Sequence, residues 1–438
     1  MATKHLMLAV FIAAALNTSV HAARLNYRLG LSAEHSDNIA RSSTTPVSDT
    51  VLAPWLGFAV TQDSEALSLQ AAGDLEYRRY LDASFGPELR ARAGLRGNWN
   101  IVPQRLSWAF EDVVSDQPIN SFAADQPDNR QRANVLVTGP TLALRPSPRT
   151  RLLTELRYVN THAERTTEFN SDRLNAAVRG LLNLSPRRVV SMNIEVGDIR
   201  FDTPSRQNGD YRRHDGFMRY NQRGSRGEWS MDAGATRLRF DATSSHAAGT
   251  ETSPLLRLRG SFELTDISRI EASLQRQSSD AAQDLLDSAP KVEDYDLPIG
   301  LPDLRSGAVS ADVFEESGIS LGLSRRSESL YLRLDGYRRE QAYQRSGGLD
   351  QSSRGLRAAM TRQLRTNLSL GLFATAEWRD FDTLGRDDRD TRLGLLGNWR
   401  WSRRLGVSAE LSRSVRRSTD PTQPYDDNRL VVSISYVR

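Results

Sequence analysis

The chain has 438 residues, of which 38% are hydrophobic, and its 58 basic and 54 acidic residues give a formal net charge of +4. The mean hydropathy of −0.52 excludes a bundle of membrane-spanning helices, and no apolar run after residue 22 approaches the roughly 18 residues that a spanning helix needs. Near-balanced charge argues against nucleic-acid binding, and the absence of cysteine excludes disulfides and thiolate metal sites.

The N-terminus differs from the rest of the chain. Lys4 and His5 precede an apolar run, Leu6–Leu16, and Val20-His21-Ala22 offers a small-residue cleavage site before Ala23. This order of segments is typical of a secretory signal peptide. The sequence therefore predicts a cleaved leader at residues 1–22 and one exported domain at residues 23–438.

Apolar and polar residues alternate along almost the whole mature chain. In the stretch 391–413, Leu393, Leu395, Trp399 and Trp401 alternate with polar residues before a short break, and the alternation then resumes. Because a β-strand sends successive side chains to opposite faces, such a stretch is a hairpin with one apolar and one polar face. Counting these units predicts about twenty strands of roughly ten residues. The number could be eighteen, because the segments 105–115, 211–221 and 317–324 alternate weakly.

The breaks between strands alternate in length. Nine short breaks of three to five residues, most with turn-forming residues such as Pro103, Pro186 or Asn367, separate longer polar segments. The longer segments lie near residues 35–49, 81–87, 117–131, 162–172, 202–210, 241–252, 278–314, 340–352, 381–390 and 416–427. A propeller would repeat at a fixed spacing, and a sandwich would not produce this strict alternation.

The fold predicted from these features is all-β. In lipid every backbone polar group must be paired within the protein, so a sheet with an apolar outer face must close on itself. We expect a single antiparallel up-and-down transmembrane barrel in the outer membrane of a Gram-negative bacterium, with short periplasmic turns and long extracellular loops. No other segment could cover the apolar face, so outer-membrane lipid is the expected partner.

Aromatic residues on the apolar face mark the predicted boundaries of the membrane. Trp99, Trp399 and Trp401 come just before short breaks, where a periplasmic aromatic girdle is expected. Near the long-loop ends of the strands lie Tyr77, Tyr80, Tyr158 and Trp378.

Arginine dominates the opposite, lumen-facing positions. The predicted set is Arg28, Asp74, Glu76, Arg90, Arg92, Arg96, Arg157, Arg173, Arg179, Arg257, Arg259, Arg333, Asp335, Arg357, Glu377, Arg392 and Arg400. Two interpretations remain open. The arginines either form ladders of ion pairs that stiffen a wide barrel, or they line a path for an anionic or hydroxyl-rich polymer, because the guanidinium fork suits carboxylates.

The segment Ser278–Phe314 is the longest predicted loop. It carries eight acidic residues and an apolar, proline-containing piece, Leu297–Pro302. A loop of this length in a barrel usually has a role. It either folds inward as a constriction against the arginines of the lumen or covers the barrel from outside.

No enzymatic site, metal site or cofactor site is predicted. His214-Asp215 is the only local acid–base pair, and neighbouring residues of a strand point to opposite faces. No metal-ligand spacing, glycine-rich phosphate loop or nucleophile elbow is present.

Short motifs near the N-terminus resemble a barrel family that accompanies exopolysaccharide gene clusters of the PEP-CTERM/exosortase type. The motifs are His35–Arg41 with Ser48-Asp49-Thr50, Tyr77–Asp82 and Asn100–Leu106. The resemblance implies a passive outer-membrane conduit in polysaccharide export, with polysaccharide and periplasmic or inner-membrane export machinery as partners. It assigns no catalytic residue.

Two other functions remain as alternatives to export: a general or sugar-selective porin, and a structural barrel whose loops anchor extracellular matrix. The chain also departs from the aromatic C-terminus common among outer-membrane barrels, since Arg438 follows Tyr436 in the same phase.

Overall fold

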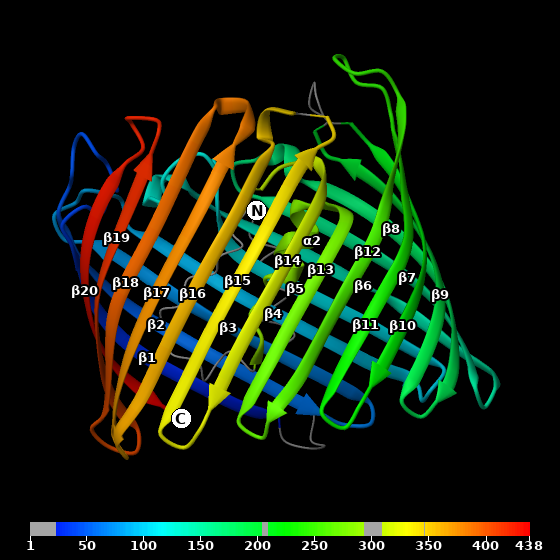
Figure 1. Ribbon diagram of the computed structural model, residues 1–438, viewed down its shortest axis with the longest axis horizontal. Coiled ribbons are helices and arrows are strands. Elements are labelled where there is room, and N and C mark those ends of the chain that lie inside the picture. The colour runs from blue at the N-terminus through cyan, green and yellow to red at the C-terminus, as the bar shows by residue number, and fades with distance from the viewer. Residues whose placement is uncertain (1–22, 204–208, 293–308, 346) are drawn as a thin grey trace.

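The computed structural model describes residues 23–203, 209–292, 309–345 and 347–438, which form one closed antiparallel sheet of twenty strands (Figure 1). The predicted leader, residues 1–22, lies outside the described residues. The strands are β1 (Arg24–Ser36), β2 (Asp49–Asp63), β3 (Leu67–Tyr80), β4 (Glu88–Val102), β5 (Leu106–Pro118), β6 (Arg130–Ser147), β7 (Thr150–Ala163), β8 (Ser171–Ser185), β9 (Arg188–Phe201), β10 (Tyr211–Arg223), β11 (Gly227–Phe240), β12 (Gly249–Thr265), β13 (Ser268–Asp280), β14 (Val313–Arg326), β15 (Leu330–Tyr343), β16 (Gln351–Arg365), β17 (Leu368–Phe381), β18 (Arg386–Arg400), β19 (Leu405–Ser418) and β20 (Tyr425–Val437).

The first and last strands close the barrel. Leu31 in β1 lies opposite Ile434 in β20, and the backbones of Tyr27 and Arg438 exchange two hydrogen bonds of 3.1 and 2.9 Å. Every other strand pairs with its neighbours in sequence, so the sheet has no open edge. The predicted fold is therefore confirmed, with twenty strands and not eighteen, because the three weakly alternating segments are β5, β10 and β14.

The strands are longer than the predicted ten residues, at 13 to 18 residues each. The extra length lies at the long-loop end, where the outer face becomes polar. There Asn134 Nδ2 donates to Asp112 Oδ1 at 2.5 Å, and Arg200 pairs with Asp198 at 2.9 Å. Apolar alternation ends at this level, but the backbone ladder continues, so the wall projects beyond the lipid-facing belt.

Short helices occur only between strands in the described ranges. They are α2 (Ala281–Asp287) and the 3₁₀ turns η1 (Pro127–Asn129), η2 (Thr167–Phe169), η4 (Gly347–Leu349) and η5 (Asp382–Leu384). Across these ranges no helix is long and apolar enough to cross a bilayer. The sequence did not predict α2, because a seven-residue helix in a polar loop leaves too short a periodic pattern.

The tips of β13 and β14 bend into the lumen. The ladder between β12 and β13 stops at Leu256 and Arg276, although both strands continue toward the long-loop end. Above that point Val313 and Ala311 pack against the inner side of β9–β11, in a cluster with Tyr211, Leu238 and Phe240, among others. This bend directs the segment that follows β13 across the barrel interior, where Figure 1 shows α2.

The β6–β7 ladder is interrupted at Gly139 and Pro140, which have no partner in β7. At Gly139-Pro140, Arg157 Nη1 donates to the carbonyl oxygens of both residues, at 3.2 and 2.7 Å. Gly139 has a φ of +155°, and a Cβ there would lie 2.0 Å from the carbonyl oxygen of Leu156. We expect Gly139→Ala to destabilise the barrel by at least about 1 kcal/mol in urea unfolding followed by heat-modifiable mobility.

The matched control for this prediction is Gly180→Ala. A Cβ at Gly180 meets nothing within 4 Å, so this variant should unfold at nearly the same urea concentration as the wild type. Equal destabilisation of both variants would show that the close approach at Gly139 is unimportant.

Candidate functional site

Two aspartates anchor helix α2 to the barrel wall: Asp280, its N-cap residue, and Asp284, within the helix. Asp280 caps the helix by accepting from the Gln283 backbone N–H at 3.0 Å, and it pairs with Arg173 of β8 at 2.6 Å. One turn later Asp284 pairs with Arg339 of β15 at 2.7 Å. These ion pairs hold α2 between two separate sectors of the wall.

The apolar face of α2 packs against the inner wall of β5–β7. Ala281, Ala282 and Leu285 belong to one buried cluster with Phe169 of η2 and the wall residues Val113, Ala133, Val135, Val159 and Ala163. These wall positions face the lumen yet are apolar, which is unusual in a barrel with a polar interior. Covering them is a hydrophobic reason for the helix to lie inside the barrel.

The chain after α2 reaches β4. Arg92 Nη2 donates to the carbonyl oxygen of Ser288 at 3.3 Å, and the carbonyl oxygen of Pro290 lies 2.9 Å from the position of a Cβ on Gly94. Of the two interpretations of this loop, the inward constriction is the one that residues 281–292 and 309–312 adopt. The apolar piece Leu297–Pro302 lies outside the described residues.

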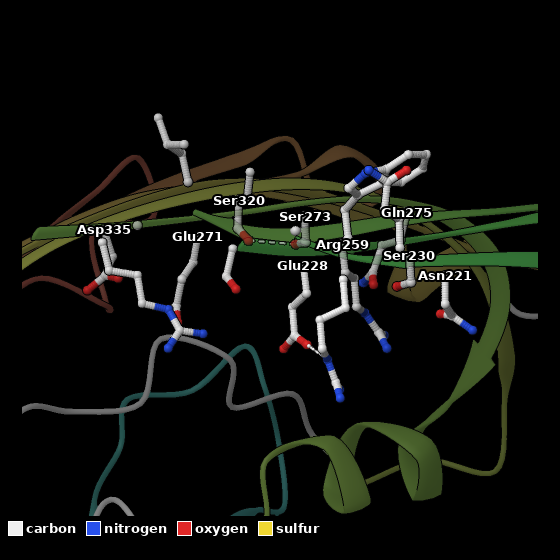
Figure 2. A pocket seen from close by; sticks show the side chains of 18 of the residues that line it. Asn221, Glu228, Ser230, Arg259, Glu271, Ser273, Gln275, Ser320 and Asp335 are labelled. Carbon is white, nitrogen blue, oxygen red and sulfur yellow. Dashed lines mark hydrogen bonds and ion pairs between the residues drawn. The ribbon is translucent and has the colours of Figure 1, made fainter. Parts of the chain in front are cut away.

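One cavity lies toward the short-turn end of the lumen, with a volume of about 1020 Å³ (Figure 2). Figure 2 shows side chains such as Arg259, Glu271 and Gln275 extending from the wall toward the interior, where α2 and the neighbouring loops lie. Its lining holds seven basic side chains and four carboxylates: Arg187, Arg223, Arg259, Arg269, Lys291, Arg333 and Arg357, with Glu228, Glu271, Asp287 and Asp335. The cavity therefore has an excess of positive charge.

A second cavity, the chamber, has a volume of about 410 Å³ and lies on the long-loop side of α2. Asp284, Leu285 and Ser288 line its α2 side. On the opposite side lies the β5–β6 loop, residues 119–129, which extends across to β17 and places the ring of Phe122 against that of Phe381 with centroids 5.2 Å apart. Six arginines and five carboxylates line the chamber: Arg41, Arg92, Arg130, Arg379, Arg392 and Arg416, with Asp116, Asp125, Asp284, Glu377 and Asp390.

Two carboxylates of the chamber are each shared by two arginines. Asp125 pairs with Arg41 at 3.2 Å and with Arg130 at 2.6 Å. Asp390 pairs with Arg416 at 2.7 Å and also with Arg379. Two arginines and one aspartate give each triad by itself a net positive charge, and a further carboxylate lies beside each: Asp427 is 3.7 Å from Arg41, and Glu377 is 3.9 Å from Arg379.

Partial removal from water would by itself raise the pKa of the Asp125 carboxyl, but the guanidinium groups of Arg130 and Arg41 together outweigh this effect and hold the pKa well below its usual range. Asp125 therefore stays ionised at any physiological pH. The charge of the triad around it is fixed.

The ten arginines predicted for the lumen lie, by strand alternation, on the face opposite the exposed apolar side chains. Six pair with carboxylates: Arg90 with Glu88, Arg96 with Glu111, Arg179 with Glu155 and Glu195, Arg257 with Asp232, Arg333 with Asp335, and Arg392 with Glu410. Cavity linings include Arg92, Arg259, Arg333, Arg357 and Arg392. The last of the ten, Arg400, donates to the carbonyl oxygen of Thr366 at a short turn.

Sequence reasoning missed most of the chamber. Arg379 and Arg416 have the inward phase of their strands, so the alternation used for the other arginines could have found them. Arg41 and Asp125 lie in loops, and Arg130 is the first residue of β6. The alternation of a strand carries no information about such positions. Only the folded loops bring them beside β17 and β19.

The predicted girdle tryptophans are on the outside at the short-turn end. Trp99, Trp399 and Trp401 are 51%, 45% and 69% exposed, and the last two rings stack with centroids 6.2 Å apart. Tyr80, expected near the outer boundary, is instead 5% exposed and faces inward, where its hydroxyl donates to Glu88 Oε1 at 2.6 Å. The error is one of phase, because Tyr77 and Tyr80 lie on opposite faces of β3.

His214 and Asp215 do not form a pair. Asp215 is buried in the inner wall, where it accepts from Arg213 Nε at 2.8 Å and from the Thr236 hydroxyl at 2.5 Å. His214 lies on the other face of β10. This geometry offers no acid–base dyad at this position.

Comparison with known proteins agrees with the architecture. Residues 329–438 match the family model described as "Putative beta-barrel porin 2", which covers the last quarter of the chain. No curated protein matches the sequence.

Solved barrels resemble the chain at low identity. The siderophore receptor PirA from Pseudomonas aeruginosa has 13% identity and a TM-score of 0.44, over 96% of this chain and 81% of the receptor. OccK2 (OpdF) from the same species, in complex with glucuronate, has 10% identity and a TM-score of 0.39, over 95% and 98%. The FrpB iron transporter from Neisseria meningitidis has 7% identity and a TM-score of 0.45, over 94% and 82%. Likenesses this distant carry no information on substrate.

The chain is a porin-like barrel of the Gram-negative outer membrane. Its sheet is closed, its outer belt is apolar, and its C-terminal quarter matches a porin model. The short turns are periplasmic and the long loops extracellular, so the chamber lies on the extracellular side of α2 and the larger cavity on the periplasmic side.

The position of Asp284 predicts a pH dependence. Burial raises the pKa of Asp284 to about 6, Arg339 opposes this, and the neighbouring carboxylates Glu316 and Asp287 add to it; Tyr343 also lies close by. A solvent-exposed aspartate has a pKa of about 3.9, so the seated helix gains stability as the pH falls from about 6 to 4 and loses it as the pH rises. We expect brief openings to a larger conductance to be more frequent at about pH 8 than at about pH 5 in single-channel recordings.

Asp284→Asn should remove this dependence, because an amide does not titrate in this range. Asp287→Asn, at the last residue of α2, is the comparison variant: it removes one of the charges that raise the pKa of Asp284, so it should weaken the dependence and keep its direction. An unchanged pH profile in Asp284→Asn would contradict the assignment.

Proposed function

We propose that the protein is a passive, non-enzymatic diffusion channel of the outer membrane that favours small anionic solutes. The observation that carries this proposal is the charge of the lumen on both sides of α2. Seven basic side chains face four carboxylates in the periplasmic cavity, and six face five in the chamber. A positive field in a confined lumen raises the local concentration of anions and excludes cations.

The dimensions of the lumen support small solutes. Side chains alone do not fill a barrel of this strand number, and porins of sixteen to eighteen strands already enclose an aqueous channel. Here α2 and the β5–β6 loop divide the interior into spaces of about 1020 and 410 Å³. Small-molecule pockets commonly measure about 300–1,000 Å³, so these spaces suit a solute of that size.

The shared carboxylates suit conduction. Arginine offers forked donors that match a carboxylate or phosphate, and Asp125 and Asp390 each offset part of the charge of two arginines. An anion is therefore attracted without being held tightly. Conduction requires binding that is favourable enough for entry and weak enough for exit.

Exopolysaccharide export, the function implied by the resemblance, remains an alternative prediction. An acidic polymer could use the same arginines, and it would need the periplasmic and inner-membrane partners named above, because the outer membrane has no energy source of its own. The seated α2 and the β5–β6 loop make the chamber narrow, however. A polymer would pass only if these segments left the lumen, which gives the two functions different requirements.

Charge removal tests the anion preference. Arg130→Gln leaves Asp125 paired with Arg41, and Arg379→Gln leaves Asp390 paired with Arg416. Glu377 loses its 3.9 Å ion pair with Arg379 but keeps the hydrogen bond from the Tyr337 hydroxyl. We expect the double variant to lower the chloride-to-potassium permeability ratio by at least about twofold in planar bilayers. Arg276→Gln, on the outer wall in a pair with Glu315, is the control and should leave the ratio unchanged. A cation-selective wild type would refute the proposal.

A disulfide lock separates the two functions. A Cβ on Gly94 would lie 3.4 Å from Cβ of Ala289, close to the spacing of disulfide-bonded cysteines, and the chain has no cysteine of its own. The same Cβ would lie 2.9 Å from the Pro290 carbonyl oxygen, so the backbone at Pro290 must shift slightly to accept it. In Gly94→Cys/Ala289→Cys we expect oxidation to leave small-anion conductance within about twofold of the reduced channel, because the path that we propose for anions runs past the seated helix. Loss of conductance on oxidation would contradict this. Polysaccharide release that stops on oxidation would favour export.

A further inference from the structure

The outer wall carries a group of aromatic and basic side chains that the channel does not use. Trp378 of β17 lies directly opposite Arg354 of β16 on one side and Arg389 of β18 on the other. Both guanidinium groups lie over its ring, 5.7 and 5.4 Å from the centroid. We call these three residues the outer clamp.

More arginines continue the row. Arg338 lies opposite Arg354, and Arg417 lies opposite Arg389. Like charges directly opposite each other on a sheet are destabilising unless something neutralises them. Arg338 pairs with Glu340 at 2.6 Å, but neither Arg354 nor Arg389 has a carboxylate partner among the described residues.

The clamp residues share one level of the wall. Trp378 lies ten residues from Leu368, the first residue of β17, while Arg354 and Arg389 each lie eleven residues from the periplasmic ends of their strands. On the membrane side of this level the outer face is apolar, with Leu356 54% and Leu393 63% exposed. The clamp therefore stands at the outer boundary of the lipid-facing belt, where tryptophan is enriched in membrane proteins.

The carboxylates near the clamp indicate the direction of approach. Asp380 and Asp387 lie opposite each other, one layer further toward the extracellular solution. These two aspartates would repel a soluble anion that approaches from the extracellular solution. A negatively charged group anchored in the bilayer meets the arginines from the side of Leu356 and Leu393.

We infer that the outer clamp binds the phosphate of a phosphorylated lipid of the outer leaflet. Arg354 and Arg389 donate charge-assisted hydrogen bonds to the phosphate, Trp378 holds both guanidinium groups in place, and the acyl chains lie on the leucines below. The site is independent of the lumen. Its occupation neutralises the charges of Arg354 and Arg389, which have no carboxylate partner among the described residues.

Lipid titration of the full-length, detergent-solubilised barrel tests this inference. The probe is diphosphorylated lipid A in mixed micelles, with binding followed by native mass spectrometry. We expect Arg354→Gln/Arg389→Gln to weaken binding at least about tenfold, because two charge-assisted contacts are lost. Arg276→Gln, an outward arginine already paired with Glu315, should change it by less than about twofold.

Two further probes identify the ligand chemistry. Lipid A stripped of both phosphates should bind the wild type as weakly as the phosphorylated form binds the double variant. Inorganic phosphate at the same concentration should not compete. Equal binding of the stripped lipid, effective competition by phosphate, or wild-type affinity in the double variant would each overturn the inference.

Assembly of each variant is checked by heat-modifiable mobility. If the double variant does not assemble, the single variants Arg354→Gln and Arg389→Gln are tested separately. Each is then expected to weaken binding at least about threefold, and wild-type affinity in both would overturn the inference.

Discussion

The need to pair every backbone N–H and C=O inside a bilayer determines most of this structure. An open sheet would leave two unpaired edges in lipid, so β20 must return to β1, as it does along Arg28–Ser36. Closure with twenty strands in turn produces a lumen too wide for wall side chains to fill. The protein fills part of that space with loops, and the position of those loops decides what the channel can pass.

Two kinds of interaction hold the loop after β13 in the lumen. Apolar wall positions on β5–β7 need a cover, and Ala281, Ala282 and Leu285 supply it. Asp280 and Asp284 then fix the helix to two separate sectors of the wall through Arg173 of β8 and Arg339 of β15. Hydrophobic burial gives the affinity of the loop for the wall, and the ion pairs give its orientation.

Arginine serves different purposes on the two faces of the wall. Inside, most arginines are paired with carboxylates, and the shared pairs at Asp125 and Asp390 leave a modest positive excess suited to passing anions. Outside, Arg354 and Arg389 stand beside Trp378 without carboxylate partners in the described part of the chain. The same residue type therefore stiffens the barrel, sets the field of the lumen and faces the lipid headgroups.

The sequence by itself determined the fold, a strand number of about twenty with eighteen left open, and the inward or outward phase of residues such as Trp399 and Arg392, because a period of two records which face meets lipid. It could not show that α2 lies inside, or that Arg41 and Arg130 meet Asp125 beside β17. Loops have no such periodicity, and residues from the β1–β2 loop, β6 and β17 come together only when the sheet closes. Tertiary structure decided the chamber because closure, and not any local pattern, places distant loops face to face.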